Sequence, residues 1–175
     1  MTLNATHRRK NSPPEELKST QLPDKPWNYV AVNLLTVSEG NHLLVIMDYY
    51  SKWPEVACMQ DINAKSIMNG LELAFITHGY PKYLRINNGQ PVVSREIQEY
   101  LTIHVIIQIK GIPYWPQSNG EVEQFNRTIL KAIKIEKVRE KSWKEEIKRF
   151  LLKYRTNPHT VTGVSPAKLL MNSRL

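Results

Sequence analysis

Three polar positions in the sequence are placed where a metal-dependent phosphoryl-transfer site would need its ligands. Asn33 interrupts an apolar run, Asn87 follows another, and Glu123 lies near the start of a long amphipathic segment. Carboxylates at such positions would hold two divalent ions about 4 Å apart, which bind the attacking and leaving oxygens. Two of the three are neutral amides, so each position alone also fits a structural role: a core amide, a turn and a solvated helix charge.

The elements that must position these residues follow from hydrophobic periodicity. Three apolar, β-prone runs, 27–37, 41–50 and 53–59, are separated by "SEGN" and "YSKWP", which suit hairpin turns. A helix is expected over about 63–78, with Gly79 as its left-handed cap. Its apolar face comprises Ile67, Leu71, Ala74 and Phe75. The segments "KYLRI" and "IHVIIQI" are predicted as a fourth and a fifth strand, with a short helix capped by Ser94 between them.

The C-terminal third is predicted to be a loop followed by helices. Residues 110–120, "KGIPYWPQSNG", contain two prolines and are expected to be a loop. A long helix follows, whose apolar face comprises Val122, Phe125, Ile129 and Ile133. "SWKE" is a capping box, and "SPAKLL" starts another helix with Ser165 as its cap. This order predicts an α/β fold, a five-stranded mixed sheet flanked by helices.

The composition is that of one soluble globular domain. Of the 175 residues, 41% are hydrophobic and 23% are charged. Residues 1–26 are polar and rich in proline, and we expect an extended lead-in there, followed by the domain over 27–175. No apolar run approaches the roughly 18 residues of a membrane span, so no membrane partner is expected. The single cysteine, Cys58, excludes an internal disulfide and a multi-cysteine zinc site, and we expect it in the core.

Positive charge is concentrated in the second part of the chain. Residues 1–109 contain 10 Lys or Arg and 10 Asp or Glu, whereas residues 110–175 contain 14 and 6, which is the whole net charge of +8. A basic half beside a neutral half indicates a surface for a polyanion, most simply nucleic acid. A solubilising basic face is the alternative.

Several motifs resemble the catalytic core of retroelement integrases, specifically those of Ty3/gypsy-type LTR retrotransposons. They are "LPDKPW", "DYYSKWPEV", "HGYPKYLRINNGQ", "PYWPQSNGEVEQFNRTILKAI" and "KYRTNPHTVTGVSPAKLL", which run from about residue 22 to 171. The family signature has 35 residues between its second acid and its glutamate, as do Asn87 and Glu123 here. The family's first acid lies on the first strand, which selects Asn33. The resemblance implies an RNase H-like fold and an ancestral role in DNA integration.

The same resemblance implies that two of the three catalytic acids have been replaced. Asn33 and Asn87 stand where the family has aspartates, which leaves Glu123 as the one expected metal ligand. An amide oxygen is a weaker ligand than a carboxylate, and its NH₂ must point away from a cation. The family uses Mg²⁺ or Mn²⁺; we expect none to bind here and no strand transfer to occur. Asp48 belongs to a non-catalytic stretch and does not restore the site. Residues 1–26 are interpreted as a remnant after a lost zinc-binding module.

DNA binding is the function that the resemblance leaves in place. It implies nucleic-acid contacts by Tyr114, Gln117 and Asn119 near the site and by Arg127, Lys131 and Lys134 along the long helix. A second hypothesis is a non-enzymatic module that forms a homodimer or a hetero-oligomer with active integrase or host proteins. A third is a decaying element copy without a selected role. The resemblance implies a nuclear location, and otherwise a cytoplasmic one.

Overall fold

The structure is a computed structural model of the chain and describes residues 23–86, 94–109 and 116–171. Asn87 and Tyr114 lie outside these ranges, as do the side chains of Gln117 and Asn119. The element bounds and contacts below refer to the described residues.

A five-stranded mixed sheet forms the centre of the molecule, in the order β3-β2-β1-β4-β5. The strands are β1 (Tyr29–Ser38), β2 (Asn41–Asp48), β3 (Pro54–Met59), β4 (Tyr83–Ile86) and β5 (Ile107–Ile109). The first three form an antiparallel meander, whereas β4 runs parallel to β1 and β5 parallel to β4. Each parallel connection carries a helix, as crossovers between parallel strands require.

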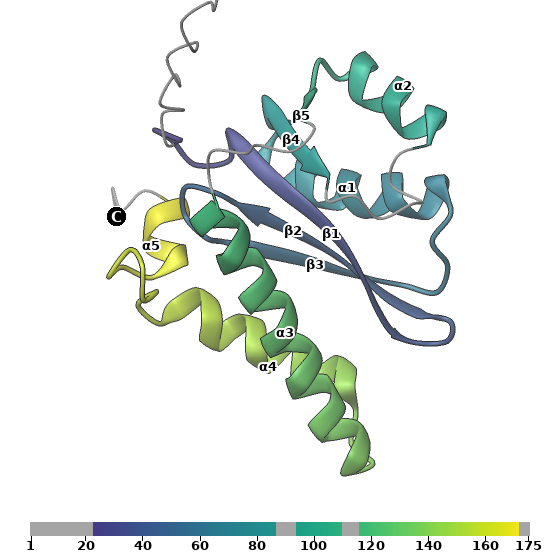
Figure 1. Cartoon of the computed structure of the whole chain (residues 1–175), viewed down its shortest axis with the longest axis vertical. Helices are drawn as coiled ribbons and strands as arrows, with labels where there is room; N and C mark the ends of the chain where they lie inside the picture. The colour runs from purple at the N-terminus through teal and green to yellow at the C-terminus, as the bar shows by residue number, and fades with distance from the viewer. Residues whose placement is uncertain (1–22, 87–93, 110–115, 172–175) are drawn as a thin grey trace, which may run out of the picture.

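Helices cover both faces of the sheet (Figure 1). One face carries α1 (Ala64–His78) and α2 (Arg95–Ile103), and the other carries α3 (Pro116–Val138) and α4 (Trp143–Thr156). Each face of the sheet forms a hydrophobic core with its helices, and the short α5 (Pro166–Leu170) packs against the core that contains α1 and α2. Alternate residues of β1 serve the two cores: Val30 and Val32 pack with α1 and α2, and Ala31 packs with α3 and α4. This alternation follows from the two-residue period of a strand.

The local signals for helix boundaries are confirmed. Ser94, Ser142 and Ser165 each cap a helix by accepting a hydrogen bond from a backbone N–H three residues later. Gly79 ends α1 with φ +84. The predicted apolar faces of α1 and α3 are buried in the two cores. Helix formation here is decided by side chains close in sequence, which is why periodicity and caps predicted it correctly.

Two helix ends place a residue other than glycine in the left-handed region. Val105 follows α2 with φ 57, and Glu140 follows α3 with φ 56. At each end the N–H of this residue donates to a carbonyl three residues back, and the next N–H donates to one five residues back. This is a Schellman motif, in which glycine is usual at the left-handed position because it has no Cβ.

Three expectations from the sequence are wrong. The fifth strand contains only Ile107–Ile109, because the first part of "IHVIIQI" completes α2 and its cap. The segment predicted as loop over 110–120 is helical from Pro116 onwards, so Glu123 lies about two turns inside α3. Cys58 is exposed because β3 is an edge strand, where one face of the strand remains open to solvent.

Candidate nucleic-acid interface

Asn33 is a buried amide in the middle of β1. Its side chain is 5% exposed, and it pairs with Val45 of β2. By alternation it lies on the same face as Ala31, which packs with Val122 and Phe125 of α3. The last residue of β4, Ile86, pairs with Val32, the residue before Asn33. The sheet thus brings the end of β4 beside Asn33, and α3 covers the same face.

Glu123 lies on α3 with an exposed side chain, next to the buried Val122. Among the described residues, no three His, Cys, Asp or Glu side chains come together in a way that could hold a metal ion. The described members of the predicted site are one carboxylate, Glu123, and one amide, Asn33. This set does not fit a pair of Mg²⁺ ions, which need several hard, charged oxygen ligands in octahedral geometry.

Asp48 cannot serve as a substitute ligand, because both of its oxygens already accept hydrogen bonds. Oδ1 accepts from the backbone N–H of Trp27 at 3.0 Å and of Tyr50 at 3.3 Å. Oδ2 accepts from the N–H of Ser51 at 2.9 Å and from its hydroxyl at 2.6 Å. Asp48 pairs with Val30, three residues along β1 from Asn33. Burial nevertheless raises the pKa of Asp48, outweighing these hydrogen bonds.

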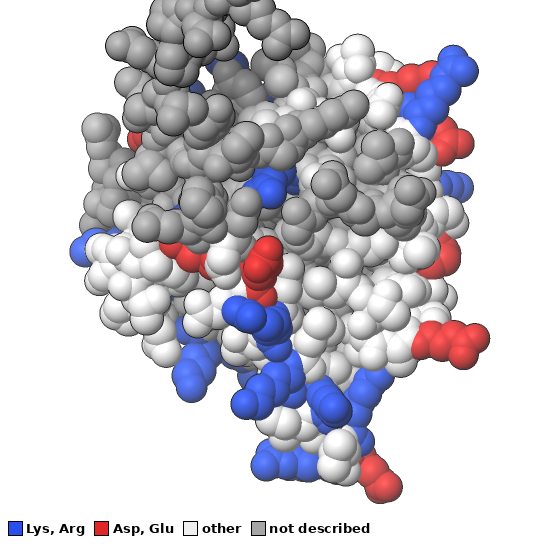
Figure 2. All heavy atoms as spheres, viewed as in Figure 1, with Lys and Arg blue, Asp and Glu red and all other residues white. Residues whose placement is uncertain are grey.

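Lysine and arginine side chains gather along the exposed side of α3 (compare Figures 1 and 2). Arg127, Lys131 and Lys134 are exposed, and none of them forms an ion pair with a described residue. They are three or four residues apart and therefore share one side of the helix. Lys137 differs, because its ammonium donates to the carbonyl of Val37 at 3.4 Å. The side chains of Arg127, Lys131 and Lys134 have no such contact with a described residue.

A buried ion pair links the first turns of α3 to the segment after β2. Lys52 Nζ lies 2.7 Å from Glu121 Oε2, and both side chains are largely buried. Nearby on this face, Arg85 of β4 donates to the hydroxyl of Tyr49 at 3.1 Å. Burial and the neighbouring Glu121 charge raise the pKa of Tyr49 in spite of Arg85. Sequence reasoning missed the Lys52–Glu121 pair, because no local signal connects residues so far apart.

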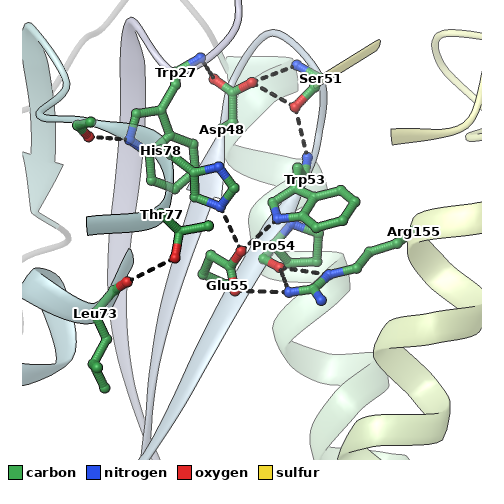
Figure 3. A network of polar contacts seen from close by, with 11 residues as sticks. Trp27, Asp48, Ser51, Trp53, Pro54, Glu55, Leu73, Thr77, His78 and Arg155 are labelled. Carbon is green, nitrogen blue, oxygen red and sulfur yellow. Dashed lines mark hydrogen bonds and ion pairs between the residues drawn. The ribbon is translucent and has the colours of Figure 1, made fainter. Parts of the chain in front are cut away.

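A second network joins β3, α1 and α4 (Figure 3). Glu55 Oε1 lies 2.7 Å from His78 Nε2 and accepts from Trp53 Nε1 at 2.8 Å. Arg155 donates to the other oxygen of Glu55 at 2.9 Å and to the carbonyl of Pro54 at 2.7 Å, and it lies over the ring of Trp53. Burial by itself would raise the pKa of Glu55. The hydrogen bonds from His78 and Trp53 and the charge of Arg155 outweigh burial, so the pKa lies below its ordinary value. The network fixes α4, and with it α3, against the sheet.

The fold is that of the catalytic core of retroviral integrases, an RNase H-like fold. The catalytic core domain of HTLV-2 integrase, solved in complex with magnesium in a trimeric form, superposes with a TM-score of 0.69 at 18% identity, covering 83% of this chain and 97% of that one. A chain in the structure of the simian T-cell lymphotropic virus intasome in complex with PP2A regulatory subunit B56 gamma gives a TM-score of 0.74 at 20% identity, covering 89% of this chain and 58% of that one. The core domain of BIV integrase gives 0.68 at 18%, covering 84% and 95%.

Sequence comparison places the chain with the polyproteins of retroelements. It is 31% identical over 156 residues to the Gag-Pol polyprotein of Walleye dermal sarcoma virus, and 23% identical over 169 residues to the Transposon Tf2-3 polyprotein of Schizosaccharomyces pombe. These matches cover 86% and 93% of this chain but only 9% and 13% of those proteins. An uncharacterised protein of Caenorhabditis elegans is 30% identical over 84% of the chain, which covers 12% of that protein. No family model matches. The chain is an integrase-catalytic-core-like domain of retrotransposon or retroviral type.

Proposed function

We propose that this domain binds nucleic acid through α3 and does not catalyse DNA strand transfer. The observation that carries the proposal is the stripe of Arg127, Lys131 and Lys134, which is exposed and without ion pairs to described residues. Cations in this state exchange water and counterions for phosphate without first breaking internal pairs. No described helix is both long and apolar enough to cross a membrane.

The loss of catalysis follows from the charges of the three site residues. A pair of metal ions contributes several kcal/mol of transition-state stabilisation, and about 4 kcal/mol corresponds to roughly 1,000-fold in rate. Asn33 and Asn87 are amides, so one formal negative charge stands where the family has three. The same replacement removes repulsion towards phosphate, which favours DNA binding over turnover.

Binding is tested by the salt dependence of the affinity for duplex DNA. Replacing Arg127, Lys131 and Lys134 by Ala should reduce the slope of log K against log salt by roughly 2 to 3 units, for every DNA sequence. The control replaces Lys65, Lys82 and Arg95, which are also exposed but lie outside α3. If the two triple variants bind alike, the α3 stripe is only a solvated face and the proposal fails.

Catalysis is tested by restoring the acids. The native chain should show no 3′-end processing or strand transfer with Mg²⁺ or Mn²⁺, and calorimetry should show no Mn²⁺ binding at micromolar levels. The double variant Asn33→Asp/Asn87→Asp should bind Mn²⁺ more tightly. Turnover by the native chain would show that one carboxylate suffices and would refute this part of the proposal.

A second candidate function is association with another integrase-like chain. Leu73 and Ile76 of α1 are 66% and 74% exposed, on the opposite face of the sheet from α3. Neighbouring apolar side chains of this size on one helix suit a protein contact. Light scattering should show a dimer that Leu73→Glu/Ile76→Glu converts to a monomer. A native monomer would remove this candidate for self-association.

A further inference from the structure

A groove of about 560 Å³ lies between α3, α4 and the segment that follows α4. This volume is within the range of small-molecule sites, roughly 300–1,000 Å³. Gln124 and Thr128 form part of its α3 wall, and Phe150 and Tyr154 belong to its α4 wall. None of the predicted site residues that the structure describes lines it, so the groove is separate from Asn33 and Glu123.

Aromatic rings line one side of this groove. The rings of Phe150 and Tyr154 are stacked, with centroids 6.1 Å apart and planes 24° apart. Phe125 meets Tyr154 edge-on at 4.9 Å and lies in the buried core, so it supports the pair. His159 also meets Tyr154 edge-on, at 5.7 Å. Burial lowers the pKa of His159, so its ring is neutral at neutral pH.

The charges around the groove leave a positive rim. The two acidic residues in its lining are already paired: Glu121 with Lys52 at 2.7 Å, and Glu146 with Arg149 at 2.8 Å. Lys153 also lines the groove, is exposed, and has no ion pair with any described residue. A ligand at this rim therefore meets an uncompensated cation.

The groove borders the basic stripe of α3. Arg127 follows Gln124 by three residues, and Lys131 follows Thr128 by three residues, so each cation is a surface neighbour of a groove residue. A phosphate backbone held by the stripe would pass the mouth of the groove, where an unpaired base could turn inwards onto the aromatic pair.

We propose that this groove takes an unpaired nucleobase of a single-stranded segment, stacked against Phe150 and Tyr154 with its phosphate near Lys153. This inference rests on the proposed nucleic-acid binding and adds a preference for single strands. An aromatic face with flanking cations is the combination that single-strand-binding proteins use, because every base has a π-face. A peptide would gain less from the uncompensated cations at the rim.

The test compares three fluorescent probes on the whole chain: a short oligothymidylate, an abasic oligonucleotide of the same length, and a duplex. The native chain should bind the oligothymidylate roughly 10-fold more tightly than the abasic strand. Phe150→Leu/Tyr154→Leu keeps both side chains apolar but removes the rings, and it should abolish that difference while leaving duplex affinity unchanged. Lys153→Ala should weaken single-strand binding, whereas Lys144→Ala, on the same helix but outside the groove lining, should not.

The outcomes separate this inference from the function on which it rests. Equal affinity for the oligothymidylate and the abasic strand, with duplex binding intact, overturns the base-binding groove and leaves DNA binding by α3 in place. No binding of any probe overturns both. A groove variant that changes self-association in light scattering, and not the preference for bases, assigns the groove to a protein partner and overturns the proposal. Circular dichroism of each variant confirms that a lost preference does not reflect unfolding.

Discussion

Replacing Asp48 by asparagine makes the same change that the resemblance implies at positions 33 and 87, at a place where the fold uses the carboxylate. Asp48 is fully buried and accepts four hydrogen bonds, from Trp27, Tyr50 and twice from Ser51. An asparagine must put its NH₂ group at one of the two oxygen positions. At the Oδ1 position it would face two backbone N–H groups; at the Oδ2 position it would face only one, because the Ser51 hydroxyl can turn to accept.

The lower-energy orientation therefore leaves one buried N–H without an acceptor. An unsatisfied buried donor costs about 1–3 kcal/mol, so Asp48→Asn should lower the free energy of unfolding by about 2 kcal/mol at neutral pH. The opposing effect is the removal of a buried charge, which would favour the amide. Burial outweighs the hydrogen bonds in setting the pKa of Asp48, but asparagine, unlike a protonated carboxyl group, carries two donor hydrogens that face fixed N–H groups, and we therefore expect a net loss of stability.

The two effects separate with pH. Burial raises the pKa of Asp48 above its ordinary value of 3.8, so between that value and its folded pKa the folded chain binds more protons than the unfolded chain. The stability that this group contributes is thus present below 3.8 and declines as the pH rises through that window. A protonated Asp48 carries one donor hydrogen, which can point to the Ser51 hydroxyl, whereas asparagine carries two. The protonated carboxyl group therefore leaves more of the surrounding N–H groups with an acceptor than asparagine does. The difference between native chain and variant should be larger at pH 3 than at pH 7.

Urea denaturation followed by tryptophan fluorescence measures both quantities, since Trp27 and Trp53 flank the Asp48 turn. Asp61→Asn is the matched control: Asp61 is exposed although it also accepts a hydrogen bond from Ser66, and its replacement should change stability by less than about 0.5 kcal/mol. An Asp48→Asn variant as stable as the native chain at pH 7, or more stable, would show that the burial penalty outweighs the hydrogen bonds and would refute the reasoning.

Four further variants test other parts of the fold. Val105→Gly should raise the free energy of unfolding by roughly 1 kcal/mol and Glu140→Gly by less, because a β-branched side chain is the more strained at positive φ. A lower melting temperature for Val105→Gly than for the native chain would contradict this. Arg155→Lys should lower stability by about 1–3 kcal/mol in urea, since lysine cannot reproduce the forked contact or the stacking on Trp53; native stability would mean that charge alone matters. The pKa of Glu55 lies below its ordinary value of 4.5, so the stability that Glu55 contributes is present above pH 4.5 and is lost as the pH falls through its folded pKa. Glu55→Gln should therefore reduce the loss of stability in acid. An unchanged dependence of the unfolding free energy on pH would exclude this role.

The sequence by itself determined the elements that depend on near neighbours. Ser94, Ser142 and Ser165 begin helices because each side chain reaches a backbone N–H three residues away. The order of strands and helices, with the motifs of the resemblance, predicted the five-stranded mixed sheet and its integrase-like fold. The choice of Asn87 and Glu123 came from their 35-residue spacing and that of Asn33 from the resemblance, and this site stays a prediction. Sequence erred where a segment could take two forms, as in the apolar run that completes α2 before it becomes β5.

Only the tertiary structure decided which side chains meet across long stretches of chain and which remain in solvent. Lys52 pairs with Glu121 and Arg155 with Glu55 because the sheet and α3 or α4 bring them together, and charge patterns along the chain do not encode such distances. Cys58 is exposed because β3 takes the edge of the sheet, a position set by strand order. The groove between α3 and α4 likewise arises from how two helices pack on one face. The residue types limit which contacts are possible, and the packing of the elements determines which of these contacts form.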